Sequence, residues 1–267
     1  MKKYLSVFEI SYQQEFAYRL NFIMWRFRNI IQVFITFFMW TSIFAGSNKI
    51  IFGYSKERIF TYVLGILMVR AFVMSSRSAD VSGDISRGEI TNYLLRPINY
   101  FGFWLTRDLS SKVLNMIFAL VETIILFLIL KPVFFIQTNP LLVFAFLVSL
   151  AIAFFIYFNL LFLTNSVPFW YPEVAWGAQF LFMVVIAEFL SGSLFPIDVL
   201  PAVAQDILML TPFPYLIYFP LQVYLGKLST AMMLKGIVIS GAWLVLLGFC
   251  LNKIWKRGLK AYTAHGR

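Results

Sequence analysis

The chain has 267 residues, of which 61% are hydrophobic and only 13% are charged, and its mean hydropathy is +0.81. Because a soluble domain usually carries about 25% charged residues, this composition excludes a globular protein built around one core. The net charge is +10, and the lysines and arginines behind it cluster at the ends of particular apolar runs. This distribution argues against a nucleic-acid-binding protein.

Six long apolar runs follow one another along the chain. Each approaches the roughly 20 residues that a helix needs to cross a 30 Å hydrocarbon layer. The sequence therefore predicts an all-α membrane protein, with one transmembrane domain over residues 1–267 and six spans. The runs are Phe22–Ala45, Ile59–Met74, Val113–Leu130, Leu141–Phe162, Val174–Leu194 and Ala231–Leu251.

Residues 1–21 precede the first run and predict an amphipathic helix. Leu5, Phe8, Tyr12 and Phe16 recur at spacings of three and four residues, with polar side chains between them. Such a helix is expected to lie in the membrane interface.

Spans one and two are expected within residues 22–79. Arg26 and Arg28 open the first of them, and the aromatic residues nearby place both arginines at the headgroup level. Arg70 is near the end of the second span, where a long side chain can extend to water.

Residues 80–100 form a charged connection that contains a short predicted helix. Ser86 and Glu89 have the spacing of a capping box, which would start a helix that runs through Ile90. Pro97 ends it, because a proline disfavours helix at the residue before it. A helix this short needs a surface to dock against.

Spans three to five are expected within residues 104–194, and they contain Glu122 and Glu188. Carboxylates at membrane depth are costly, so both are candidates for function, the alternative being neutral or hydrogen-bonded packing residues. Residues 191–226 are apolar but interrupted by Pro196, Pro201 and Pro212, among other prolines. This pattern predicts a re-entrant outer segment rather than a straight span.

Residues 229–254 form the predicted sixth span, and residues 255–267 a basic tail. Lysine and arginine cluster before the first span, around the 75–112 connection and after the last span, whereas the opposite loops hold fewer. Since basic residues favour the cytoplasmic side, both termini and the 75–112 connection are expected in the cytoplasm.

Nucleotide and metal motifs do not occur in the sequence. There is no phosphate-binding loop, and one cysteine, Cys250, and one histidine, His265, give no zinc-ligand spacing. The chain is therefore expected to bind no cofactor and to have no enzymatic activity of its own.

Three features together resemble the permease subunits of type-2 ATP-binding-cassette (ABC) exporters. They are the order of the predicted elements, the stretch from Ser82 to Ile90 with its continuation Leu94-Leu95-Arg96-Pro97, and Ser191-Gly192-Ser193-Leu194-Phe195-Pro196 ahead of the last span. The basic tail is similar to that of a small six-span subgroup. The resemblance covers nearly the whole chain, although the chain lacks a sizeable extracellular domain.

The resemblance implies a subunit that forms the translocation path of an exporter in a bacterial-type cytoplasmic membrane. It implies a second permease subunit, identical or related, and a cytosolic ATPase partner that binds ATP and magnesium. The 80–100 helix would be the coupling helix that contacts the ATPase. Its apolar docking face would be Ile85, Ile90, Tyr93 and Leu94, its polar rim Asp84, Arg87, Glu89 and Arg96, and the outer gate Glu188, Pro196, Pro201 and Pro212.

Two other functions remain open at this stage. An ion-coupled secondary transporter or a membrane enzyme would use Glu122 and Glu188 as a proton relay. An inverted repeat would favour such a transporter, and none is visible in the sequence. The chain is alternatively an assembly partner that takes no part in coupling within a heteromeric permease.

Overall fold

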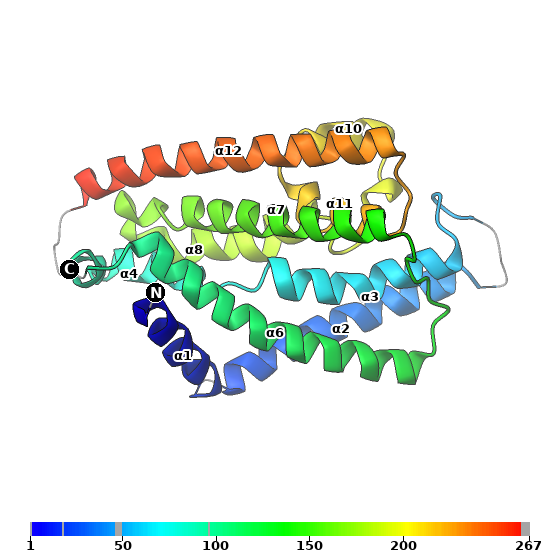
Figure 1. Cartoon of the computed structure of the whole chain (residues 1–267), viewed down its shortest axis with the longest axis horizontal. Helices are drawn as coiled ribbons and strands as arrows, with labels where there is room; N and C mark the ends of the chain where they lie inside the picture. Colours follow the sequence, from blue (N-terminus) through cyan, green and yellow to red (C-terminus); the bar gives the residue numbers. More distant parts are fainter. Residues whose placement is uncertain (1, 18, 46–49, 96, 263–267) are drawn as a thin grey trace.

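The computed structural model describes residues 2–17, 19–45, 50–95 and 97–262. Helices account for most of these residues, and the pairing of Ile51 with Tyr54 is an isolated bridge, with no β-strand in the described ranges. The long helices run roughly along one axis (Figure 1). The all-α fold predicted from the sequence is therefore confirmed.

Twelve α-helices are connected by short turns in the described residues. They are α1 (Lys2–Ala17), α2 (Arg19–Ile43), α3 (Lys56–Val73), α4 (Val81–Ser86), α5 (Ile90–Leu94), α6 (Tyr100–Leu130), α7 (Pro140–Thr164), α8 (Ala175–Phe180), α9 (Ala187–Leu190), α10 (Ala202–Met209), α11 (Tyr218–Tyr224) and α12 (Thr230–Ala261). The 3-10 turns are η1 (Arg77–Asp80), η2 (Val167–Phe169), η3 (Pro172–Val174), η5 (Ile197–Val199) and η6 (Phe213–Tyr215), and η4 (Leu181–Ile186) is a π-helix.

Polar side chains define where the long helices begin. Ser55 caps α3, Asn99 caps α6, Asn139 caps α7 and Ser229 caps α12, each by accepting a hydrogen bond from an amide of the first turn. Such caps satisfy amides that have no partner within the helix. These helix starts are therefore encoded locally in the sequence.

Four helical stretches of the described chain are long and apolar enough to cross a membrane. They are Tyr100–Leu130, Pro140–Phe169, Pro172–Leu190 and Thr230–Ala261. A fifth candidate is formed by Lys56–Val73 with Arg77–Ser86, which are bent by 53°. The predicted first span lies in α2, which is not among them, because Arg26, Arg28 and Gln32 lower its hydropathy. The described chain thus has four to five candidate spans, and six spans remain a prediction.

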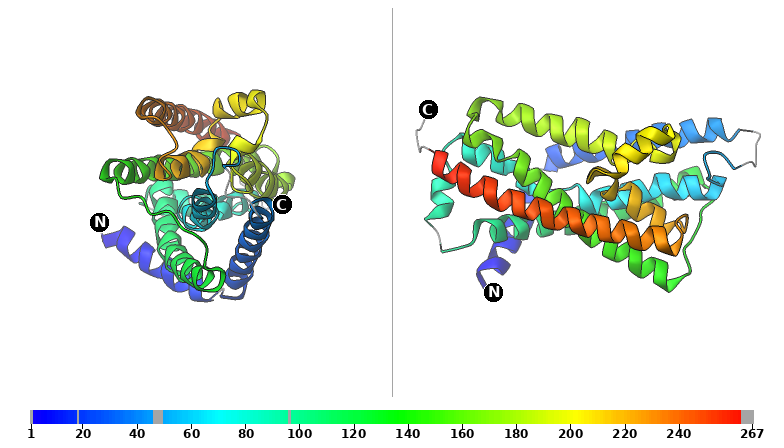
Figure 2. Two further views of the ribbon diagram at one scale, coloured as in Figure 1. Left: turned by 90° about the vertical axis from the view of Figure 1, so that its right-hand side faces the viewer. Right: turned by 90° about the horizontal axis from the view of Figure 1, so that it is seen from above.

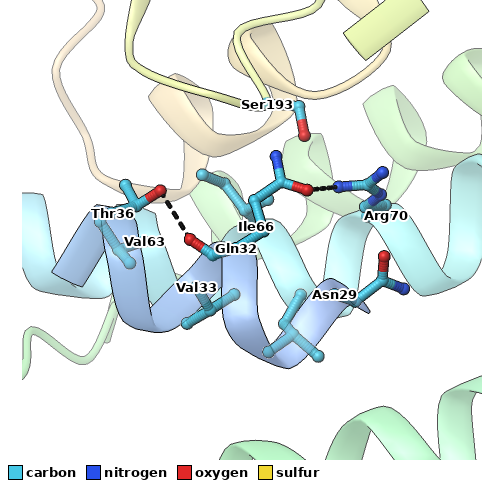
Figure 3. A pocket seen from close by; sticks show the side chains of 9 residues that line it. Asn29, Gln32, Val33, Thr36, Val63, Ile66, Arg70 and Ser193 are labelled. Carbon is cyan, nitrogen blue, oxygen red and sulfur yellow. Dashed lines mark hydrogen bonds between the residues drawn. The ribbon is translucent and has the colours of Figure 1, made fainter. Parts of the chain in front are cut away.

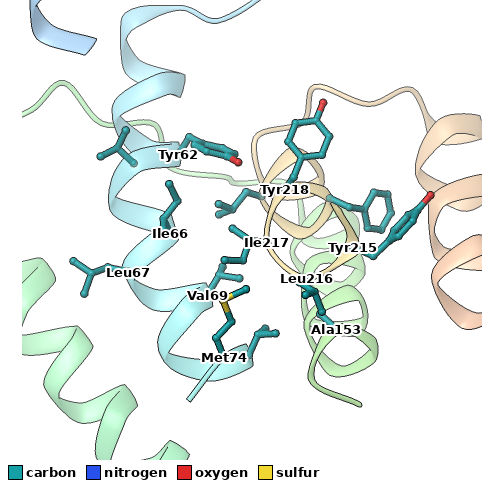
Figure 4. Packing of buried hydrophobic residues seen from close by; sticks show 14 of the residues in the cluster. Tyr62, Ile66, Leu67, Val69, Met74, Ala153, Tyr215, Leu216, Ile217 and Tyr218 are labelled. Carbon is teal, nitrogen blue, oxygen red and sulfur yellow. The ribbon is translucent and has the colours of Figure 1, made fainter. Parts of the chain in front are cut away.

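Helix α3 lies at the centre of the hydrophobic core. Eleven of its residues are buried, and it packs against α2, α6, α7 and α11. Ile66 and Val69 of α3 lie toward residues 215–218, which lead into α11, whereas Leu67 points to the other side of α3 (Figure 4). The broken segment between α9 and α12 is therefore folded onto the centre of the bundle.

Helix α1 is inclined to the bundle and projects from its side (Figure 2). It packs against α6, where the Ser110 hydroxyl donates to the Phe8 carbonyl at 3.1 Å. The end of the bundle that carries α1, α4 and α5 is called the inner end below, after its predicted orientation, and the opposite end the outer end. The position of α1 in a membrane interface stays a prediction.

Candidate functional site

A connecting segment, residues 77–99, joins α3 to α6 at the inner end. The predicted capping box does not form, because the Ser86 hydroxyl donates to the Gly83 carbonyl at 3.2 Å. Gly88 has a φ of +81°, a left-handed conformation that favours glycine, and it turns the chain between α4 and α5. The helix predicted after the box is present as α5, which begins at Ile90.

Buried apolar side chains attach the connecting segment to the rest of the bundle. Ile85 and Ile90 belong to a cluster with Tyr100 of α6 and Trp255 of α12, whose rings lie 5.3 Å apart. Ile85 and Ile90 are thus packed inside this chain instead of forming the exposed docking face expected from the sequence. Burial in this cluster gives the short helices the support that they lack alone.

The other predicted coupling residues are distributed between the interior and the surface. Asp84 is buried and accepts a hydrogen bond from the Tyr100 hydroxyl at 3.2 Å. Tyr93 is half-buried, with its ring 5.2 Å from that of Phe103.

The surface of the segment carries the remaining polar groups. Arg87 and Glu89 are exposed and paired at 3.0 Å, and Leu95 is 81% exposed. The Leu94 side chain and Arg96 lie outside the described residues. The segment therefore presents the Arg87–Glu89 pair and Leu95, which belongs to the stretch that carries the resemblance but was not assigned to the docking face.

One arginine–glutamate pair crosses the interior of the bundle between α2 and α6. Arg26 Nε donates to Glu122 Oε1 at 2.7 Å, Nη2 contacts the other carboxylate oxygen, and Nη1 lies 3.4 Å from Asn115 Oδ1. Both side chains of the pair are buried. The carboxylate of Glu122 thus holds Arg26 inside the bundle, and the depth of Arg26 at the headgroup level stays a prediction.

A second carboxylate is shared by two arginines. Arg28 Nη2 donates to Glu188 Oε1 at 2.7 Å, and Arg70 Nη2 contacts the same oxygen. Arg70 also donates to Gln32 Oε1 at 2.6 Å. Arg70 therefore does not extend to water as expected, and its side chain is only 11% exposed. Glu188 links α2, α3 and α9.

These ion pairs border a cavity of about 410 Å³, called the inner cavity below. Arg26, Arg28, Arg70 and Glu188 line it on the side nearer the outer end, and Glu15, Arg77 and Asp80 line it on the side nearer the inner end. Arg77 donates to both oxygens of Glu15 at 2.6 and 2.7 Å. Trp25, Trp176 and Phe180 add an aromatic wall. The bundle thus holds a cavity lined by both charged and apolar side chains, among helices with apolar outer surfaces.

A much smaller pocket continues from the inner cavity toward the outer end. The two share Asn29 and Arg70, and the smaller pocket, about 10 Å³, reaches Ser193 (Figure 3). Within the described residues, Gln32 Nε2 and Ser193 Oγ are buried without a hydrogen-bond partner. The volume suits a single water molecule that could bond to both groups. Polar groups therefore lead from Arg70 to the start of the outer segment.

The outer segment, residues 191–226, is broken into short helices as the prolines predict. Pro196, Pro201 and Pro212 each immediately precede a short helix: η5, α10 and η6, respectively. Gly192 has a φ of +80°, and a Cβ there would lie 2.9 Å from both Tyr218 Cβ and Tyr62 Oη. Glu188 lies outside this segment, facing the inner cavity, so the structure separates the four predicted gate residues into two places.

Asp198 holds the outer segment together, although no pattern in the sequence points to it. It accepts from Tyr218 Oη at 2.7 Å and Gln222 Nε2 at 2.9 Å, it contacts Tyr54 Oη, and it pairs with Lys227 at 3.3 Å. The Lys227 ammonium also lies 3.2 Å from the centre of the Tyr54 ring. The partners are up to 144 residues away in the chain, so no local motif indicates the cluster.

Replacing Asp198 with asparagine is expected to destabilise the protein by about 1.5–3 kcal/mol, because hydrogen bonds to a charged group are lost or weakened. The measurement is the thermal unfolding midpoint of the purified protein. Asp206→Asn is the matched control, since Asp206 is exposed on α10. Equal midpoints for the two variants would contradict the role given to Asp198.

A comparison with protein families gives one match over most of the chain. The model described as ABC-2 family transporter protein matches residues 30–266. No curated protein sequence matches the chain. The matched range includes the connecting segment, both buried glutamates and the outer segment, whereas Arg26 and Arg28 lie just before it.

Proposed function

Since the chain belongs to the ABC-2 family of transporter proteins, we propose that it is the membrane permease subunit of an ATP-driven exporter. The family supports a permease role in ABC transport. The observation that carries the proposal further is the inner cavity, which places charged side chains among helices whose outer surfaces are apolar. Charged groups at such positions typically line a transport path or pair with one another. Here they pair with one another and line a cavity, which supports the proposal.

In the proposed complex, two permease subunits with six spans each form the path, and separate cytosolic ATPases bind ATP and magnesium. The connecting segment contacts the ATPase through its exposed residues Arg87, Glu89 and Leu95. Its buried residues Ile85 and Ile90 transmit the movement to α6, α7 and α12, because they are packed against those helices. ATP binding then shifts the equilibrium between two states of the bundle, because a ligand favours the state that it binds better.

The proton-relay alternative has less support. Such a relay requires carboxylates that exchange protons, whereas Glu122 and Glu188 are each held by arginine.

The outer segment would close the path at the outer end in the proposed exporter, with Pro196, Pro201 and Pro212 setting its shape. Glu188 would act at the closed end of the inner cavity instead of in that gate.

The test of the proposal is reconstitution of the purified chain with its ATPase. ATP-dependent export in liposomes and co-purification of the two proteins are expected. A chain that transports an ion or a solute without any ATPase would contradict the proposal and favour a secondary transporter.

The proposed topology places the connecting segment in the cytoplasm of a bacterial-type cell and the 131–139 loop outside. In a Cys250→Ala background, an impermeant thiol reagent is expected to label Ile136→Cys in sealed cells and to miss Asn92→Cys. Both positions are exposed in the structure, so access depends on the side of the membrane. Opening the cells should make Asn92→Cys reactive. Labelling of Asn92→Cys in sealed cells would overturn the orientation.

A further inference from the structure

The charges of the inner cavity are unevenly distributed around it. Arg26 has its own carboxylate in Glu122, and Arg77 has Glu15, but Arg28 and Arg70 share the single carboxylate of Glu188. Two guanidinium groups therefore face one carboxylate at Glu188, and the carboxylate of Asp80, which balances the count, lines the cavity elsewhere. Within a low-dielectric environment, an excess positive charge attracts an anion strongly.

Arg28 is the arginine with hydrogen-bonding capacity to spare. A guanidinium has five N–H donors, and among the described residues Arg28 makes one hydrogen bond, to Glu188. Its side chain is 36% exposed and lines the inner cavity, whereas that of Arg70 is 11% exposed and donates to two acceptors. A ligand in the cavity can therefore reach Arg28 without breaking the contact between Arg70 and Glu188.

An apolar wall of aromatic rings leads from the cavity to the surface of the bundle. Trp176 and Phe180 stack with ring centres 5.2 Å apart, and Trp176 is 75% exposed. Trp25 of α2 lines the same cavity, is also exposed, and lies beside Arg28, whose guanidinium carbon is 5.4 Å from the centre of its ring. Because these rings lie on helices with apolar outer surfaces, an apolar chain can pass between cavity and bilayer beside them.

We propose that the inner cavity binds an amphipathic anion, with a phosphate or carboxylate headgroup on Arg28 and an apolar tail along Trp176 and Phe180. Arginine suits such headgroups because its donors can bind two oxygen atoms at once. Asp80, at the exposed side of the cavity, disfavours an anion there and directs the headgroup toward Arg28. The claim that this ligand is the exported substrate rests on the proposed function, whereas binding itself does not.

The experiment measures ligand binding to the full chain in nanodiscs of zwitterionic lipid, corrected with empty nanodiscs. The probes are dodecyl phosphate, dodecanol, dodecyltrimethylammonium and inorganic phosphate. Dodecyl phosphate is expected to bind most tightly. Arg28→Gln should weaken its binding about tenfold or more, because a charge-assisted hydrogen bond is lost. Arg28→Lys, which keeps the charge, should bind more tightly than Arg28→Gln.

Arg257→Gln is the matched control, since it removes one arginine from the exposed surface of α12 and should leave binding unchanged. Equal binding of dodecanol, or equal binding by Arg28→Gln and the wild type, would overturn the anion site. Inorganic phosphate binding as tightly as dodecyl phosphate would overturn the role of the apolar wall.

The same preparation separates this inference from the proposed function. Absence of anion binding in a protein that still co-purifies with its ATPase contradicts only the anion site. Binding that depends on Arg28, in a protein that never associates with an ATPase, contradicts only the exporter. Thermal unfolding of Arg28→Gln checks that the variant is folded, which is expected because Arg70 keeps its contact with Glu188.

Discussion

Glu188→Gln is expected to destabilise the protein by about 3–5 kcal/mol, the typical cost of removing one partner from a buried ion pair. Glutamine keeps the size of the side chain but leaves Arg28 and Arg70 without a counter-charge. Arg70 is the more affected of the two, because it is almost completely buried. The measurement is the thermal unfolding midpoint in detergent, together with the yield of folded protein.

Glu173→Gln is the control for this substitution, since Glu173 is exposed in η3 and the same chemical change there should be nearly silent. A Glu188→Gln variant as stable as the wild type would show that the contacts with Arg28 and Arg70 contribute little. A second variant, Glu188→Asp, keeps the charge on a shorter side chain and should recover part of the lost stability.

Leu95→Asp is expected to abolish co-purification of the ATPase while the permease still folds and inserts. Among the large apolar side chains of the connecting segment that the structure describes, that of Leu95 is the most exposed. An apolar anchor at an interface typically contributes about 2 kcal/mol or more, which corresponds to about 30-fold in affinity. A carboxylate at its place would also be desolvated without a partner. The readout is the ATPase recovered with the affinity-tagged permease.

Val133→Asp serves as the control for Leu95→Asp. Val133 is also an exposed apolar residue, but it lies in the loop between α6 and α7 at the outer end, so ATPase recovery should be unchanged. Normal recovery with Leu95→Asp would remove the connecting segment's exposed surface from the proposed interface. Loss of recovery with both variants would indicate a general defect in folding instead of a local contact.

The sequence predicts well what depends on local composition. Hydropathy predicts α7 and α12 as spans, because their apolar runs contain few charged residues. Pro196, Pro201 and Pro212 predict a broken outer segment, because proline lacks the amide hydrogen and is disfavoured beyond the first turn of a helix. In each case the physical cause is within the segment itself.

The sequence does not predict what depends on distant partners. Arg70 looks like a residue that reaches water until Glu188, 118 positions later, is placed beside it. Ile85 and Ile90 look like a docking face, because a short amphipathic stretch does not reveal whether its apolar side meets its own chain or another. Asp198 carries no signal at all, since its partners Tyr218, Gln222 and Lys227 have no recognisable spacing from it and its fourth partner, Tyr54, is 144 residues away.

The π-helix η4 gives this region room for a change in length. A π-helical stretch holds more residues in each turn than an α-helix, and η4 ends immediately before α9, which carries Glu188. The wider turn takes up about one residue more than an α-helix would over the same rotation. Deleting one codon within 181–186 is therefore expected to give a continuous α-helix in which Glu188 keeps its direction relative to Trp176. The same deletion within α7, which is α-helical throughout, would instead turn the two parts of that helix by about 100° relative to each other.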